Sequence, residues 1–170
     1  EKPKREEAFS KLINAGAYAL EREVLSHIGD GFVSMEREVF PKLLDKGMYG
    51  FQFDGHWIDC GTRENVIGAH RILMGDDANV SRNSVSGGAA VHPPSVVCDE
   101  AVVAGAVIGP GTYISPRCVV GPMSSVEGSV LYDDVRVGTR CRIVDSIIDQ
   151  GVSVPDGAEI VSEIVSRAKQ

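Results

Sequence analysis

The stretch that decides the fold runs from residue 96 to residue 131 and reads VVCDEAVVAGAVIGPGTYISPRCVVGPMSSVEGSVL. An aliphatic residue recurs every six positions, with two later slips of one residue. The series is Val96, Val102, Ile108, Ile114, Val120, Val126, Leu131, Val137, Ile143, Ile148, Val154 and Ile160. Six residues make one short strand and one tight corner, so three repeats close a triangular coil of about 18 residues.

Positions four residues after these aliphatic residues are mostly small or β-branched, with Glu100 and Val130 as the less typical ones. Such an interior excludes large rings, and residues 77–170 contain nineteen Val but no Phe and no Trp. The pattern resembles the hexapeptide repeat of left-handed parallel β-helices, and the expected handedness comes from that resemblance. We therefore expect residues 77–170 to form a β-helix domain that acts as a scaffold or oligomerisation element.

Two enzyme classes that use hexapeptide repeats are disfavoured by the histidine content of this half. Hexapeptide acyltransferases typically use a histidine base, and γ-type carbonic anhydrases hold a metal with three histidines. Residues 77–170 contain only His92, which stands before Pro93-Pro94 as a turn residue would. The Cys residues of this half are interpreted as packing residues rather than as ligands of a zinc site, because no C-x-x-C pair occurs.

Composition changes near Gly75, and we place a domain boundary within 74–80, between domains 1–76 and 77–170. Residues 1–76 hold all five Phe and the one Trp but only four Val. The pattern there predicts an α/β segment with a buried strand over 12–20, a short helix over 21–28, and a hairpin over 48–60.

Two further helices are predicted in this first half. One begins after an N-cap at Ser34, is interrupted at Pro41 and ends at Gly47. The other begins after Thr62 and continues through Met74. Its buried face is predicted from residues three or four apart, which are Val66, Ile67, His70 and Leu73.

The formal net charge of −7 disfavours binding to nucleic acid or to an anionic membrane surface. The longest apolar stretch, residues 101–108, is too short to span a bilayer. Four scattered Cys are typical of reduced thiols, so we expect a cytoplasmic protein. The chain starts with Glu1 rather than Met, and we expect that a segment precedes it.

Three short groups of polar residues stand in surroundings that favour a binding site. Asp59 lies between Ile58 and Cys60, where a carboxylate needs a partner or a metal, although it also fits a helix cap. The run 14–16, Asn-Ala-Gly, suits close approach to a polar ligand or a simple turn. The run 1–3, Glu-Lys-Pro, places an acid beside a base, or is a solvated terminus.

Taken in order, these groups resemble the C-terminal part of sugar-1-phosphate nucleotidyltransferases. The blocks are E-K-P (1–3), I-N-A-G-x-Y (13–18), S-x-E-R-E-V-F-P-K-L (34–43) and W-I-D-C-G-T (57–62), followed by the hexapeptide repeat. The second and third blocks favour mannose-1-phosphate guanylyltransferases. Residues 129–138 and 154–157 also look like glucose-1-phosphate adenylyltransferases.

The resemblance implies a Rossmann-like catalytic domain that joins a nucleoside triphosphate to a sugar 1-phosphate and releases pyrophosphate. Residue by residue, it implies that Glu1 binds sugar hydroxyls and that Lys2 binds the sugar phosphate as a catalytic residue. Asn14 and Gly16 are implied to line the sugar pocket. Asp59 is implied to be catalytic as one ligand of Mg²⁺, and a second Asp is expected upstream.

The glycine-rich nucleotide loop of the family is missing from these 170 residues, so we expect a C-terminal fragment without turnover of its own. GTP and mannose 1-phosphate are the favoured substrates, and self-association through the β-helix is expected. The alternatives are an adenylyl- or thymidylyltransferase acting on glucose 1-phosphate, a non-catalytic regulatory paralogue, and, least favoured, an acyltransferase. The sequence leaves the base and the sugar open.

Overall fold

The computed structural model describes residue 6 and residues 10–80 and 84–167. Contacts divide the chain into two compact units, Glu1–Trp57 and Ile58–Gln170, and each is described here by itself. Among the residues that the structure describes, no helix is long and apolar enough to cross a membrane.

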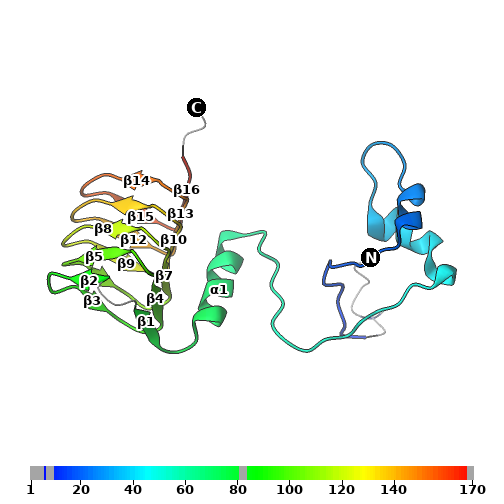
Figure 1. The fold of residues 1–170 in the computed structure, drawn as a ribbon, viewed down its shortest axis with the longest axis horizontal. Coiled ribbons are helices and arrows are strands. Elements are labelled where there is room, and N and C mark those ends of the chain that lie inside the picture. The colour runs from blue at the N-terminus through cyan, green and yellow to red at the C-terminus, as the bar shows by residue number, and fades with distance from the viewer. Residues whose placement is uncertain (1–5, 7–9, 81–83, 168–170) are drawn as a thin grey trace. The chain divides into compact units, whose positions relative to one another are not determined.

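The second unit is a parallel β-helix with one α-helix beside it (Figure 1). Its strands form three sheets with the orders β1-β4-β7-β10-β13-β16, β14-β11-β8-β5-β2 and β15-β12-β9-β6-β3, so the chain makes about five turns. The strands are β1 (Ala78–Val80), β2 (Val85–Ser86), β3 (Ala90–Val91), β4 (Ser95–Val97), β5 (Val102–Ala104), β6 (Val107–Ile108), β7 (Thr112–Ile114), β8 (Val119–Val120), β9 (Ser125–Glu127), β10 (Val130–Leu131), β11 (Arg136–Val137), β12 (Arg142–Val144), β13 (Ile147–Ile148), β14 (Ser153–Val154), β15 (Glu159–Val161) and β16 (Ile164–Val165).

Most coils contain 17 residues rather than the expected 18. Val130 pairs with Ile147, and Val137 pairs with Val154, each 17 positions along the chain. Two strand pairs, β2 with β5 and β6 with β9, have a separation of 18. One side of most coils is therefore five residues long.

The predicted interior series is right from Ile108 onward, where every member is at most 9% exposed. Its first two members are wrong by one position. Val102 is 45% exposed, whereas its neighbour Val103 is fully buried; similarly, Val97 is buried and Val96 faces outward. A five-residue side between Val103 and Ile108 causes this shift.

Small or β-branched side chains fill the interior two residues before each large one. The atypical Glu100 and Val130 of the sequence pattern are one position out of register, because Ala101 and Ser129 are the buried small residues. In the six-stranded sheet these positions form a ladder of fully buried hydroxyls, each of which donates to a backbone carbonyl oxygen: Ser95, Thr112, Ser129 and Ser146. Hydroxyls can be buried there because they are hydrogen-bonded.

The corners of the coils form three ladders of residues with positive φ. The ladders are Glu100, Arg117, Asp134 and Gly151; Gly105, Met123, Arg140 and Gly157; and Gly111, Gly128, Asp145 and Ser162. The corner amide donates to a carbonyl of the preceding coil, as from Gly128 to Pro110 at 3.0 Å and from Asp145 to Glu127 at 3.0 Å. These bonds, repeated along the stack, hold non-glycine residues in the left-handed region.

Helix α1 (Arg63–Met74) packs on the outer face of the six-stranded sheet, as Figure 1 shows. That face carries an apolar column in register, which is Val96, Tyr113, Val130, Ile147 and Ile164. Ile67 of α1 packs against Val130 and Ile147, and all three are buried. Val130 thus contacts the helix, not the coil interior. The predicted face of α1 is right for Val66, Ile67 and His70, but Leu73 is 85% exposed.

The helices of the first unit are short. They are η1 (Arg22–His27), η2 (Met35–Val39), η3 (Phe40–Lys42) and η4 (Leu44–Lys46), of which η2 is a π-helix and the others are 3₁₀-helices. Ser34 caps η2 by accepting from Arg37 N–H, and Gly47 ends η4 at φ 87°. The predicted caps at Ser34, Gly47 and Thr62 are therefore confirmed.

The strands predicted in this region are wrong. Residues 12–20 and 48–60 are described in full and contain no strand. A strand requires a neighbour for its backbone N–H and C=O groups, and an isolated hairpin is only marginally stable in water. The apolar residues of these segments are spaced as on one face of a β-strand. However, no described segment lies beside them to pair with them as a strand.

Candidate functional site

Asn14 and Gly16 form one tight turn. The side-chain Oδ1 of Asn14 accepts from the Gly16 N–H at 3.0 Å, and Gly16 has φ +74°. No heavy atom lies within 4 Å of where a Cβ on Gly16 would stand, so the positive φ, rather than space, is what favours glycine here. Of the two interpretations of residues 14–16, the simple turn is therefore present in the structure.

A chain of hydrogen bonds joins two of the sequence blocks. Asn14 Nδ2 donates to the hydroxyl of Tyr18 at 2.5 Å, and that hydroxyl donates to Glu36 Oε1 at 2.8 Å. The Tyr18 hydroxyl lowers the pKa of Glu36 by donating to its charged form. Sequence reasoning missed Tyr18 and Glu36 as a pair, although both belong to the quoted blocks.

Aromatic contacts hold the same turn in place within the first unit. The ring of Tyr18 stands edge-on to that of Phe40 at 4.8 Å between centroids. The indole N–H of Trp57 donates to the carbonyl of Ala15 at 3.0 Å, across 42 positions of sequence. The block at 13–18 and the start of the block at 57–62 therefore meet at residues 14–16.

Asp59 lies in the second unit, in the loop that leads into α1, and its side chain is exposed. Its Oδ1 accepts from the Gly61 N–H at 3.0 Å, and its backbone carbonyl accepts from Asn65 Nδ2 at 2.7 Å. The helix cap is Thr62, which accepts from the Asn65 N–H at 3.3 Å. The cap interpretation of Asp59 is therefore wrong, and its carboxylate forms a turn before the helix.

Glu1 and Lys2 lie outside the described residues. Within residues 10–80 and 84–167, no three His, Cys, Asp or Glu side chains gather as a metal site would require. A single exposed carboxylate such as that of Asp59 is a ligand type that suits Mg²⁺, which takes most of its ligands from substrate phosphates and water.

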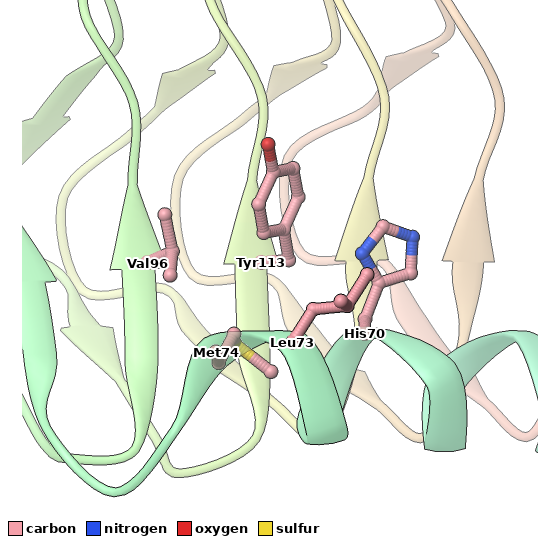
Figure 2. Close-up of a pocket in the computed structure, with 5 residues that line it drawn as sticks. All are labelled: His70, Leu73, Met74, Val96 and Tyr113. Carbon is pink, nitrogen blue, oxygen red and sulfur yellow. The ribbon is translucent and has the colours of Figure 1, made fainter. Parts of the chain in front are cut away.

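A second candidate is an open hollow of about 250 Å³ between α1 and the sheet (Figure 2). His70, Leu73 and Met74 line it from the helix, and Val96 and Tyr113 line it from the strands. The imidazole of His70 lies against the Tyr113 ring, with 4.8 Å between centroids and a tilt of 37°, and burial lowers the pKa of His70.

The polar groups around this hollow are held by one another. Cys98 Sγ donates to the Tyr113 hydroxyl at 3.4 Å, and this bond with partial burial raises the pKa of Tyr113 to about 12. The Tyr113 hydroxyl is therefore neutral at physiological pH. The Cys118 thiol does not line the hollow; it lies in the interior of the β-helix, where burial raises its pKa to about 11. Three of the five side chains that line the hollow, Leu73, Met74 and Val96, are apolar.

Comparisons with known proteins show the family to which the chain belongs. A sequence model of the family described as "GlmU-like, C-terminal hexapeptide" matches residues 75–169, and one described as "Nucleotidyl transferase" matches residues 1–74. The chain belongs to the sugar-1-phosphate nucleotidyltransferase superfamily. Its β-helix is thus of the hexapeptide type, and the blocks around Asn14 and Asp59 belong to the nucleotidyltransferase part.

Relatives within this superfamily are named for different substrates. A mannose-1-phosphate guanylyltransferase of Mycobacterium tuberculosis is 34% identical over 82% of this chain and 39% of its own length. A mannose-1-phosphate guanyltransferase of Saccharomyces cerevisiae is 33% identical over 54% of this chain and 25% of its own. A glucose-1-phosphate adenylyltransferase of Rhodopirellula baltica is 30% identical over 68% of this chain and 32% of its own. The chain spans well under half the length of each.

The superfamily match and the contacts assign α1 differently. The two sequence models meet between Met74 and Gly75, so α1 belongs by descent to the nucleotidyltransferase part. By contacts, α1 belongs with the β-helix, and the units divide between Trp57 and Ile58. The helix that follows Asp59 therefore lies within the nucleotidyl transferase match but packs on the β-helix.

Proposed function

We propose that the protein carrying this chain transfers a nucleotidyl group from GTP to mannose 1-phosphate, giving GDP-mannose and pyrophosphate. The observation that carries the proposal is the nucleotidyl transferase match over residues 1–74, joined to similarity with one mannose-1-phosphate guanylyltransferase over 82% of the chain. A phosphate oxygen of the sugar phosphate attacks the α-phosphorus in line. A new P–O bond forms as the bond to the leaving pyrophosphate breaks.

The residues of this chain bind the sugar-phosphate side in this proposal. Lys2 neutralises the sugar phosphate, and Glu1 accepts from sugar hydroxyls. Asn14 and Gly16 line the sugar pocket through a turn that is held by Tyr18 Oη and by the indole of Trp57 within the first unit. A turn that is already fixed lowers the entropic cost of ordering the pocket when the sugar binds.

Mg²⁺ is the cofactor of the proposal and would neutralise charge on the two phosphate-bearing substrates. Asp59 would be one ligand through its exposed carboxylate. The Gly61 N–H holds Oδ1 of that carboxylate at 3.0 Å, which fixes its direction. Self-association through the β-helix is also part of the proposal.

A second candidate is adenylyl transfer to glucose 1-phosphate. The similarity to a glucose-1-phosphate adenylyltransferase over 68% of the chain favours it. The same residues would serve either reaction, because the phosphate chemistry is shared and only the base and the sugar differ.

Pyrophosphate release by the full-length protein tests the proposal. The protein is supplied with Mg²⁺ and each of GTP, ATP, UTP and dTTP, with and without mannose 1-phosphate or glucose 1-phosphate. We expect release from GTP only when mannose 1-phosphate is present. Fastest release from ATP with glucose 1-phosphate would select the second candidate. No release with any pair would indicate a non-catalytic paralogue.

A further inference from the structure

The loop that carries Asp59 is tied to the first turn of α1. Asn65 donates from Nδ2 to the Asp59 carbonyl at 2.7 Å, while the Asn65 N–H donates to Thr62 Oγ1 at 3.3 Å. One residue of the helix thus fixes both the helix cap and the backbone of Asp59. Any rotation of α1 must move the Asp59 carbonyl with it or break this bond.

The middle of α1 is in turn fixed on the β-helix. Ile67 is 4% exposed and packs on Val130 and Ile147 from two successive coils. Because this contact is apolar, it sets the distance of the helix from the sheet more than its rotation or its shift along the sheet.

Arg71, one turn after Ile67, supplies a directional contact. Its guanidinium lies 3.3 Å from Asp145 Oδ1 in one of the corner ladders. A Cβ on Gly111 would stand 2.7 Å from Arg71 Nε, and one on Gly128 would stand 2.8 Å from Arg71 Nη2. The guanidinium therefore occupies space that two glycines of the same ladder leave open.

These glycines are placed where the fold does not demand glycine for φ alone. Asp145 and Ser162 hold positive φ in the same ladder, as do Glu100, Arg117 and Met123 in the other ladders. Glycine at 111 and 128 instead leaves the space through which the Arg71 side chain reaches the ladder, because a Cβ at either position would clash with the guanidinium.

We propose that the β-helix positions Asp59 through α1, with Arg71 and Asn65 as the positioning residues. Arg71 fixes the rotation of α1 by binding Asp145 across Gly111 and Gly128. Asn65 then carries that orientation to the Asp59 backbone. The inference rests on the proposed function only for the role of Asp59; the connection itself is a property of the second unit.

Amide hydrogen exchange in the full-length protein tests the connection without metal or substrate. We expect Arg71→Ala and Asp145→Asn each to speed exchange of the Gly61 amide by about two- to fivefold, the range open to an exposed ion pair. Arg142→Ala is the matched control, because it removes an Arg–Glu159 pair of 2.9 Å between coils that does not involve α1. It should leave the Gly61 amide unchanged.

Asn65→Asp separates positioning from helix stability. A carboxylate in the first turn favours the helix, but it has no N–H to donate to the Asp59 carbonyl. Exchange over residues 66–74 should therefore stay the same or slow, while the Gly61 amide exchanges faster. The Mg²⁺ concentration for half-maximal activity should rise about two- to fivefold in Arg71→Ala with a smaller change in kcat.

The proposal is overturned if the Gly61 amide is unaffected by Arg71→Ala and Asp145→Asn, or if Arg142→Ala affects it equally. Asp145→Asn keeps the shape of the side chain and serves if Arg71→Ala does not fold. The exchange data do not depend on catalysis. Even if Asp59 had no role in activity, the exchange rates would still show whether α1 holds the loop that carries Asp59.

Discussion

The β-helix buries its apolar side chains within its own coils, whereas the described residues up to Trp57 bury only Val39 and Phe40. In that first unit Phe32, Tyr49 and Phe51 are each at least 90% exposed. In the β-helix, by contrast, every member of the large aliphatic interior series from Ile108 to Ile160 is at most 9% exposed.

The difference is one of where each strand finds its partner. A coil of the β-helix pairs with coils 17 or 18 residues away, so any few consecutive turns supply their own neighbours. The alternating segments of the first unit have no neighbour among the described residues. The same apolar content therefore gives a core in one region and exposed rings in the other.

The largest expected effect comes from opening the β-helix core. Ile143 is fully buried, so Ile143→Ala should lower the free energy of unfolding by about 2–5 kcal/mol. Phe51 is 91% exposed, so Phe51→Ala in the same chain should change it by less than about 0.5 kcal/mol. Urea unfolding followed by circular dichroism measures both. Equal losses would mean that residues 1–57 have a core of their own.

A smaller effect is expected at the corner ladders. Gly128→Ala places a Cβ at φ +58°, only 2.5 Å from Asp145 Oδ1, and should cost about 1–2 kcal/mol. Met123 already holds φ +60° with an exposed side chain. Met123→Gly relieves that strain but increases the conformational entropy of the unfolded chain. The free energy of unfolding should therefore change by no more than about 0.5 kcal/mol.

Thermal unfolding of the two corner variants checks this contrast. If Gly128→Ala left the stability unchanged, neither the positive φ nor the packing of Arg71 would require glycine there. A strongly destabilising Met123→Gly would show that the thioether makes contacts that its 68% exposure does not suggest.

The smallest effect is expected from pH at the contact between α1 and the sheet. Burial lowers the folded-state pKa of His70, so its neutral form favours docking. This stability is complete above the unfolded pKa of about 6.5 and is lost as the pH falls from there through the folded value. The variant His70→Gln should flatten the fall in melting temperature between pH 7 and pH 5. An unchanged slope would exclude His70 as its source.

The repeat was predictable because its period is short and regular. The register of its first coils was not, because Val96-Val97 and Val102-Val103 place a β-branched residue in either alignment. Only the burial of Val97 and Val103 distinguishes the two. The helix caps at Ser34, Gly47 and Thr62 were also predictable, since a cap depends on its own few neighbours.

The candidate site was predictable as a set of blocks but not as a geometry. The blocks named Asn14 and Asp59, but no spacing rule connects Tyr18 with Glu36, or Trp57 with Ala15. The bond from Asn65 to the Asp59 carbonyl was equally hidden, because it depends on how the loop turns before α1. Contacts of this kind are set by tertiary packing, which periodicity does not encode.

The most direct test of the proposed function is pyrophosphate release by Asp59→Asn in the full-length protein, with Asp54→Asn as the matched control. Asp54 is also exposed, five positions earlier, but lies outside the W-I-D-C-G-T block. Loss of the Asp59 carboxylate should abolish release from GTP and mannose 1-phosphate, while Asp54→Asn should keep the wild-type rate. An Asp59→Asn protein that is as active as the control would contradict the assignment of Asp59 as a magnesium ligand.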